Sequence, residues 1–188
     1  MKKNKSFFNL KAAFTLVEML AVVAIISILA GILVVSAGIA EDARKKAESK
    51  ALFRGWINAL EQYKATYGYY PNLFAGGSLE LSSGTNQADF EGTLDGSDTA
   101  RNRRGISFYT FTEADYDTSD PRNLADAFDN PDIFIVVDVD RDGTILPADF
   151  PADPDQPANL PAAGIKASIL IYTLEDAAEG YQEILSWQ

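Results

Sequence analysis

Residues 14–40 read FTLVEMLAVVAIISILAGILVVSAGIA, and this stretch decides what the rest of the chain can be. Its 27 residues carry a single charge, on Glu18. As a helix that rises about 1.5 Å per residue, the stretch would be about 40 Å long, which is enough to cross the hydrocarbon layer of a membrane. Lysines precede it, and Glu41 and Asp42 follow it. This order predicts one transmembrane helix, with the N-terminus in the cytoplasm and the body outside.

Two ordinary interpretations of this stretch fit it less well. The apolar part of a secretory signal is about 7–15 residues long, so residues 14–40 are too long for one. A plain uncleaved anchor does not account for Glu18, because a carboxylate inside a bilayer costs about 3 kcal/mol and usually has a partner. Glu18 lies one helical turn from the end of the stretch, so a side chain that reaches back to the headgroups is the alternative to a functional role.

The residues around Glu18 carry a resemblance. Residues 11–20, KAAFTLVEML, resemble the processing site of type IV prepilins and pseudopilins. The resemblance implies that a prepilin peptidase cuts between Ala13 and Phe14, removes residues 1–13 as a leader peptide and N-methylates the new terminus. Residues 14–40 then stay in the product as its transmembrane and polymerisation helix. The family usually has Gly before the cut, where this chain has Ala13.

Under this interpretation Glu18 gains a role in assembly. The freed α-amino group of Phe14 would be a cation at the membrane boundary. Glu18 of an adjacent subunit would pair with it and neutralise both charges in apolar surroundings. Because the contact joins different parts of two copies, it propagates into an open helix instead of closing into a dimer.

The helix is expected to continue through residues 41–71, its exported half. Gly68 and Pro71 predict its end. Residues 63–71, YKATYGYYP, resemble the end of the first helix in type II secretion major pseudopilins. The resemblance implies an α+β, pilin-like fold in which a long N-terminal helix packs on a small antiparallel sheet. Apolar side chains at helical spacing predict the stripe that meets this sheet: Leu52, Trp56, Ala59, Leu60, Tyr63 and Tyr67.

Residues 72–188 are expected to form the globular head. Residues 72–107 are polar and show little periodicity beyond a short strand at 79–81. Strands are predicted at 106–112, 133–139 and 167–174, with 144–146 returning as the hairpin partner of 133–139 and an apolar segment at 184–187. Arg101, Arg103 and Arg104 are interpreted either as a solvated turn or as a patch that pairs with an acidic neighbour in a filament.

Four aspartates follow the predicted strand at 133–139 with the spacing of an EF-hand loop. Asp138, Asp140 and Asp142 alternate, Gly143 allows a turn, and Asp149 occupies the twelfth position. Carboxylate oxygens at this spacing suit a structural Ca²⁺. The preceding element is a strand instead of a helix, and Asp-Gly between apolar runs also predicts a plain hairpin, so both interpretations stay open.

The same resemblance implies a second calcium candidate near the C-terminus. Major pseudopilins carry a structural calcium site in their C-terminal loop, which corresponds here to residues 175–183, EDAAEGYQE. The acids are present and the pattern of the family is not, so a plain acidic turn is the alternative.

Composition excludes several classes of protein. The net charge is −11, and without the four lysines of residues 1–13 the chain has 12 basic and 27 acidic residues, a net of −15. Such an acidic body argues against nucleic acid as a partner. The chain has no histidine and no cysteine, which removes the usual general base, the thiol nucleophile and thiolate metal sites. No enzymatic activity is expected.

The residues and the resemblance together predict a structural filament subunit of the bacterial inner membrane, with a periplasmic head and a filament in the periplasm or at the cell surface. A type II secretion pseudopilin is favoured, with prepilin peptidase, identical subunits, minor pseudopilins and an inner-membrane assembly platform as partners. The alternatives are an adhesive or DNA-uptake type IV pilin, and a membrane-tethered calcium-binding module that does not polymerise.

Overall fold

The computed structural model describes residues 15–82, 85–152 and 154–187, without the side chains of residues 33–37 and 75. The predicted leader, Ala13 and Phe14 lie outside the described residues. The chain divides into two compact units, Met1–Ala43 and Arg44–Gln188, and each is described by itself.

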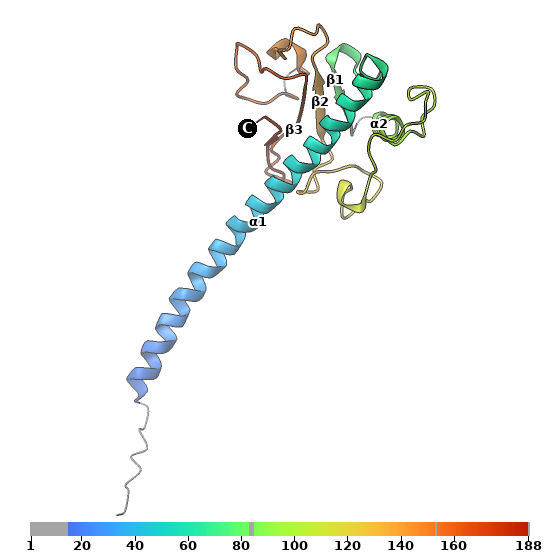
Figure 1. The fold of residues 1–188 in the computed structure, drawn as a ribbon. Helices are drawn as coiled ribbons and strands as arrows, with labels where there is room; N and C mark the ends of the chain where they lie inside the picture. The colour runs from blue at the N-terminus through green and yellow to red at the C-terminus, as the bar shows by residue number, and fades with distance from the viewer. Residues whose placement is uncertain (1–14, 83–84, 153, 188) are drawn as a thin grey trace, which may run out of the picture. The chain divides into compact units, whose positions relative to one another are not determined.

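The first helix, α1, spans Leu16–Tyr67 and contributes to both units (Figure 1). Within the described residues, no helix combines the length and the apolar character needed to cross a membrane. In the first unit all side chains of residues 15–32 are exposed. The large apolar side chains among them are Leu16, Val17, Met19, Leu20, Val22, Val23, Ile25, Ile26, Ile28, Leu29 and Ile32.

In the second unit, α1 supplies one side of the core, as its apolar stripe predicts. Trp56, Leu60 and Tyr63 are fully buried, and Leu52 and Tyr67 at the two ends of the stripe are half-buried. The helix ends where predicted, because Gly68 takes φ 84°, a left-handed conformation that glycine adopts without strain.

A four-stranded antiparallel sheet packs on this stripe, so the predicted α+β architecture is confirmed. The strands are β1 (Ser78–Glu80), β2 (Ile133–Val137), β3 (Ile169–Thr173) and β4 (Ile184–Leu185), in the spatial order β1-β2-β3-β4. β2 and β3 lie within the strands predicted at 133–139 and 167–174, and β1 overlaps the short strand predicted at 79–81. β4 forms the first half of the apolar segment at 184–187. Three short 3₁₀ helices span Ala75–Gly77, Glu113–Asp115 and Pro147–Asp149.

Both faces of the sheet are covered, which explains why β2 and β3 are continuous apolar runs. Ile135 and Ile171, paired across the two strands, belong to the cluster that contains Trp56 of α1. On the opposite face Phe134 stacks on Tyr172, with ring centroids 5.2 Å apart. Residues of the proline-rich loop and the C-terminus close this second cluster: Ile145, Phe150, Leu160, Ile165 and Trp187.

The strand predicted at 106–112 is wrong. Residues 106–112 form no strand, and the amides of Phe108 and Tyr109 both donate to the carbonyl of Leu94. The aromatic rings of this segment turn toward α1 instead: Phe108 packs on Tyr63, and Phe111 packs near Trp56. The segment at 106–112 therefore packs its aromatic rings on α1 and does not pair with a strand of the sheet.

The predicted hairpin of 133–139 with 144–146 is also wrong. Both edges of β2 are taken, because β1 and β3 flank it. Ile145 therefore pairs with Ile165 in an isolated bridge, and its side chain is buried in the second cluster.

The polar region at 72–107 contains a helix that the sequence analysis missed, α2 (Asn86–Asp95). Its buried Phe90 and Leu94 stand four residues apart, and Gly96 ends it with φ 90°. Figure 1 shows α2 beside the C-terminal half of α1, in agreement with the 5.5 Å between the rings of Trp56 and Phe90.

Candidate functional site

The N-terminal turn of α1 places Glu18 in a capping box. The backbone amide and the hydroxyl of Thr15 each donate to Oε2 of Glu18 at 2.8 Å, and the amide of Glu18 donates back to the hydroxyl of Thr15 at 3.2 Å. Thr15-Leu16-Val17-Glu18 has the sequence form of this motif, so the pattern was available and the sequence analysis missed it.

Glu18 has a second property that capping does not require. Its side chain is exposed among exposed apolar neighbours, and among the described residues no cation lies within 4 Å of its carboxylate. Oε2 of the carboxylate is engaged with Thr15, and Oε1 accepts no hydrogen bond from the residues that the structure describes. The geometry therefore offers an acceptor on an apolar surface. The predicted cleavage and methylation residues, Ala13 and Phe14, lie outside the described residues.

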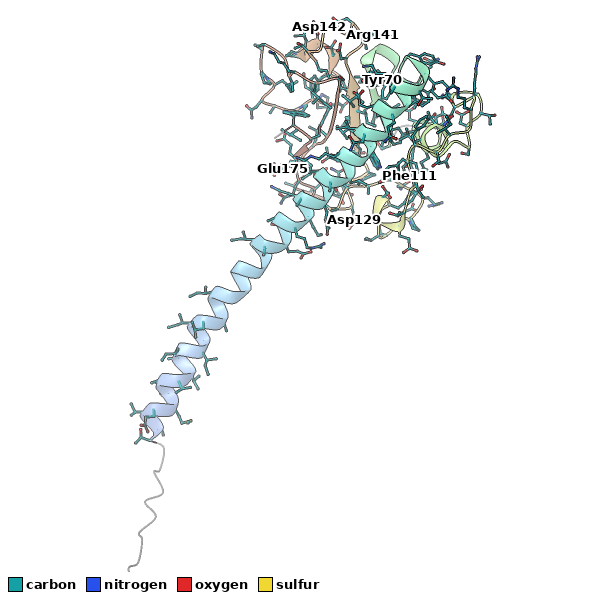
Figure 2. All side chains as sticks on the ribbon, viewed as in Figure 1. Tyr70, Phe111, Asp129, Arg141, Asp142 and Glu175 are labelled. Carbon is teal, nitrogen blue, oxygen red and sulfur yellow. The ribbon has the colours of Figure 1, made fainter. Side chains whose placement is uncertain are left out.

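Three of the four aspartates proposed as calcium ligands meet in one loop. Asp138, Asp140 and Asp142 each offer a carboxylate oxygen, and these oxygens lie within 4.8 Å of one another. Backbone amides already engage the buried Asp138, since Arg141 donates to Oδ1 at 2.7 Å and Gly143 donates to Oδ2 at 2.9 Å. Figure 2 labels Asp142 and Arg141 on this loop.

Asp149 has a different role. Its Oδ2 accepts from the amide of Leu146 at 2.7 Å, which caps the 3₁₀ helix Pro147–Asp149, and it is not grouped with the other three carboxylates. The chemistry of Asp138, Asp140 and Asp142 fits a hard cation. Calcium stays a prediction, with these three as its ligands.

The second calcium candidate is an exposed loop. All six residues 175–180 are exposed, and Asp176 and Tyr181 close the loop with a backbone bridge. Oδ1 of Asp176 accepts from the amide of Ala178 at 2.9 Å. Among the described residues, the only grouping of three potential metal-ligating side chains is the one around Asp138. A calcium site in the C-terminal loop stays a prediction, with the plain acidic turn as its alternative.

The basic cluster divides into one structural and two exposed residues. Arg101 forms ion pairs with Asp89 at 2.7 Å and Asp98 at 2.6 Å, which tie the loop after α2 back to that helix. Arg103 and Arg104 are exposed.

Two buried aspartates, both missed from the sequence, organise the second unit around α1. Asp115 accepts four hydrogen bonds: from Nε1 of Trp56 at 3.3 Å, from the hydroxyl of Tyr109 at 2.6 Å, and from the amide and hydroxyl of Thr112 at 2.7 and 2.8 Å. Asp126 accepts from the amides of Phe128 and Asn130 and from the hydroxyl of Thr173. No periodicity in the sequence marks either residue. Most of their partners lie within six residues, and one partner of each is distant in sequence, Trp56 for Asp115 and Thr173 for Asp126.

A cavity of about 630 Å³ lies between the start of this part of α1 and the loops that carry these aspartates. Its wall includes Lys45, Leu52, Tyr109, Asp115 and Asp126. Hydrogen bonds within the chain engage the carboxylates of Asp115 and Asp126, whereas Glu48 and Glu113 in the same wall are exposed.

Burial gives Asp126 a pH dependence that can be measured. Burial raises the pKa of Asp126 to about 6, above the ordinary value of 3.8, although its hydrogen bonds oppose the rise. Because the folded-state pKa is the higher one, the folded chain binds the proton more tightly. The contribution of Asp126 to the free energy of unfolding is therefore fully present below pH 4 and is lost as the pH rises through 6.

We expect Asp126→Asn to remove this loss, which amounts to about 3 kcal/mol for a shift of two units. The amide oxygen of Asn still accepts from the two backbone amides. The measurement is urea unfolding of the detergent-solubilised chain from pH 4 to pH 7. Asp132→Asn is the matched control, because it makes the same charge change at an exposed residue six positions away. Parallel pH curves for Asp126→Asn and the unaltered chain would contradict the assignment.

Comparison with known proteins bears on the first unit alone. Residues 9–34 match a family model described as the prokaryotic N-terminal methylation motif. The match includes Ala13, Phe14 and Glu18 and confirms the resemblance stated for residues 11–20. No curated protein and no solved structure matches the chain.

Proposed function

We propose that this chain, which carries the prepilin-type leader of type IV pilin-like proteins, is a structural subunit of a type II secretion pseudopilus or a closely related filament. The match to the methylation motif at residues 9–34 carries the proposal. That motif implies processing by a prepilin peptidase and pilus-type assembly, and pilin-like proteins are structural. We propose no catalytic role.

The exposed apolar surface of α1 supports assembly. Eleven large apolar side chains between residues 16 and 32 are exposed, and an apolar surface of this size needs a cover. We propose that lipid covers it while the chain waits in the inner membrane, and that the same helix of neighbouring copies covers it in the filament.

Glu18 supports a defined register between copies. After cleavage, the α-amino group of Phe14 would meet the carboxylate of Glu18 on an adjacent subunit. The second oxygen of that carboxylate accepts from none of the described residues, which supports a charge-assisted hydrogen bond from this amino group. Removing either partner would leave the other charge unpaired in apolar surroundings, so correct register is favoured.

The assignment to a secretion pseudopilus rests on the head. Many adhesive pilins close a C-terminal loop with a disulfide, and this chain has no cysteine. In its place the C-terminal segment is held by β4 pairing with β3 and by the ring of Trp187 against Tyr172 and Phe150. We propose prepilin peptidase, identical subunits, minor pseudopilins and an inner-membrane platform as partners, and a periplasmic head.

Processing gives the first test. We expect the protein isolated from membranes of a host with prepilin peptidase to lack residues 1–13 and to begin with N-methylated Phe14. Intact-mass and N-terminal peptide mass spectrometry measure both changes. The control is a host without the peptidase, where the chain should begin at Met1. A chain that keeps residues 1–13 in both hosts would contradict the proposal.

A further inference from the structure

A groove at the far end of α1 is lined by aromatic and basic side chains. It has a volume of about 400 Å³, and its wall is formed by Tyr63, Tyr69, Asn72, Ala100, Arg101 and Arg103. Tyr69 is 46% exposed and presents its ring at the surface. The hydroxyl of Tyr63 donates to the carbonyl of Arg101 at 2.7 Å, which fixes the floor of the groove.

The positive charge of this groove is not balanced within the chain. Arg101 is paired with Asp89 and Asp98, but among the described residues no carboxylate lies within 4.0 Å of the guanidinium of Arg103 or Arg104. The guanidinium of Arg104 instead lies over the ring of Tyr67, 5.6 Å from its centroid. Two exposed cations therefore flank a groove on a body whose net charge is −15 without the lysines of residues 1–13.

A matching acidic surface lies on the loop of residues 175–180, which we call the acidic loop. It carries Glu175, Asp176 and Glu179 within five residues, and all are exposed. Its side chains form no ion pair among the described residues. It follows β3 directly, and its closing residue Tyr181 faces further carboxylates, among them Asp117 and Asp132.

The groove and the acidic loop lie at opposite ends of the second unit along α1. The groove is at Tyr67, because the hydroxyl of Tyr67 accepts from the amide of Arg104 at 3.0 Å. The acidic loop is near Ser49: Thr173 before the loop donates to Asp126, and the next residue after Asp126 donates to the hydroxyl of Ser49. From Ser49 to Tyr67 the helix rises about 27 Å.

Because of this separation, the two surfaces of one copy cannot meet each other, whereas those of two copies can. We propose that the groove at Tyr63, Tyr69 and Arg103 receives the acidic loop of a second copy of this chain. This inference rests on the proposed filament function and names the contact that the globular heads of two subunits would make in the filament. Unlike surfaces meet in it, so the contact is heterologous and repeats from copy to copy in the same direction.

Charge favours this occupant over a free anion or a nucleic acid. The strongly acidic body repels diffusing polyanions, whereas a second copy brings its acidic loop into place on an already anchored chain. Exposed ion pairs are weak singly, so the contact would supply register and specificity more than affinity.

Cross-linking tests the geometry of the contact. The chain has no cysteine, so introduced thiols are unique probes. We expect the full-length chain with both Arg103→Cys and Glu179→Cys, assembled in membranes and treated with a short bismaleimide linker, to give a ladder of covalent oligomers. Each single substitution alone should give no ladder. A product that stops at a closed dimer would show a two-fold contact and overturn the inference.

Charge reversal tests the energetics. We expect Arg103→Glu to lower incorporation into filaments about tenfold or more, because like charges placed opposite each other repel. Glu179→Lys alone should do the same, and the chain with both substitutions should recover, since residues 103 and 179 then again carry opposite charges across the contact. Lys166→Glu is the matched control, an equal charge change at an exposed residue outside both surfaces.

The failures of the two proposals are distinguishable. If unaltered chains form filaments and Arg103→Glu is incorporated as well as Lys166→Glu, the groove contact is wrong and the filament function stands. If unaltered, processed chains form no filaments, the filament function is wrong, and the groove contact falls with it.

Discussion

Replacing Glu18 with glutamine is expected to abolish filament assembly while leaving the start of α1 intact. The amide oxygen of glutamine can accept the same two hydrogen bonds from Thr15, and glutamine serves in capping boxes as well as glutamate does. The substitution therefore removes the charge and keeps the cap. A cationic terminus left without its partner in apolar surroundings costs about 3 kcal/mol or more, so assembly should fall more than a hundredfold.

Two further variants, Glu18→Ala and Glu18→Asp, separate the effect of the charge from the effect of capping. Filaments sheared from cells are quantified for Glu18→Gln, Glu18→Ala and Glu18→Asp, with membrane levels of each chain as the reference. If glutamine assembles normally and alanine does not, Glu18 acts only as a cap, and the pairing with a neighbouring amine is wrong. If all three assemble normally, the side chain has no part in the filament.

Replacing Trp56 with alanine is expected to lower the free energy of unfolding of the second unit by about 4 kcal/mol. Trp56 is fully buried and lies against the rings of Phe53, Phe90 and Phe111. Its loss opens a cavity between α1, α2 and the segment at 106–112. It also removes one of the four hydrogen bonds that Asp115 accepts. Thermal unfolding should show a midpoint about 10 °C lower. Far-ultraviolet circular dichroism is the suitable measurement, because its signal comes mainly from the backbone and not from the tryptophan that is removed.

Trp56→Phe separates packing from hydrogen bonding at this position. Phenylalanine keeps most of the apolar contact and lacks the N–H group, so a loss of about 1 kcal/mol is expected in addition to a small volume term. A fall of less than about 1 kcal/mol for Trp56→Ala would mean that the rings do not pack as described.

The sequence was sufficient for α1 and for the central strands because these elements repeat a simple pattern. Trp56, Leu60 and Tyr63 recur at helical spacing, and β2 and β3 are uninterrupted apolar runs. The position of Glu18 within a motif of fixed spacing made it the best-defined candidate residue. Each of these signals is local, so no knowledge of distant contacts was needed.

Two of the remaining errors come from partners distant in sequence. The aromatic residues at 106–112 alternate like a strand, but Phe108 and Phe111 pack on α1 and the backbone bonds to α2. The segment around Ile145 was predicted to pair with β2. Both edges of β2 are occupied by β1 and β3, so Ile145 pairs with Ile165 instead. The short helix α2 was hidden by its polar composition, since Phe90 and Leu94 are the only large apolar side chains among its four buried residues. Asp149 has the spacing of a calcium ligand, and without an ion its Oδ2 accepts from the amide of Leu146, a local bond that the spacing does not reveal.

The edges of the sheet decide how closely these heads can crowd together. β1 has three residues and β4 has two, so neither edge offers a long row of free backbone donors and acceptors. Short edges discourage strand addition between molecules. Heads held side by side at very high local density should therefore meet through side chains and loops, and separate again, without fusing into an aggregated cross-β mass.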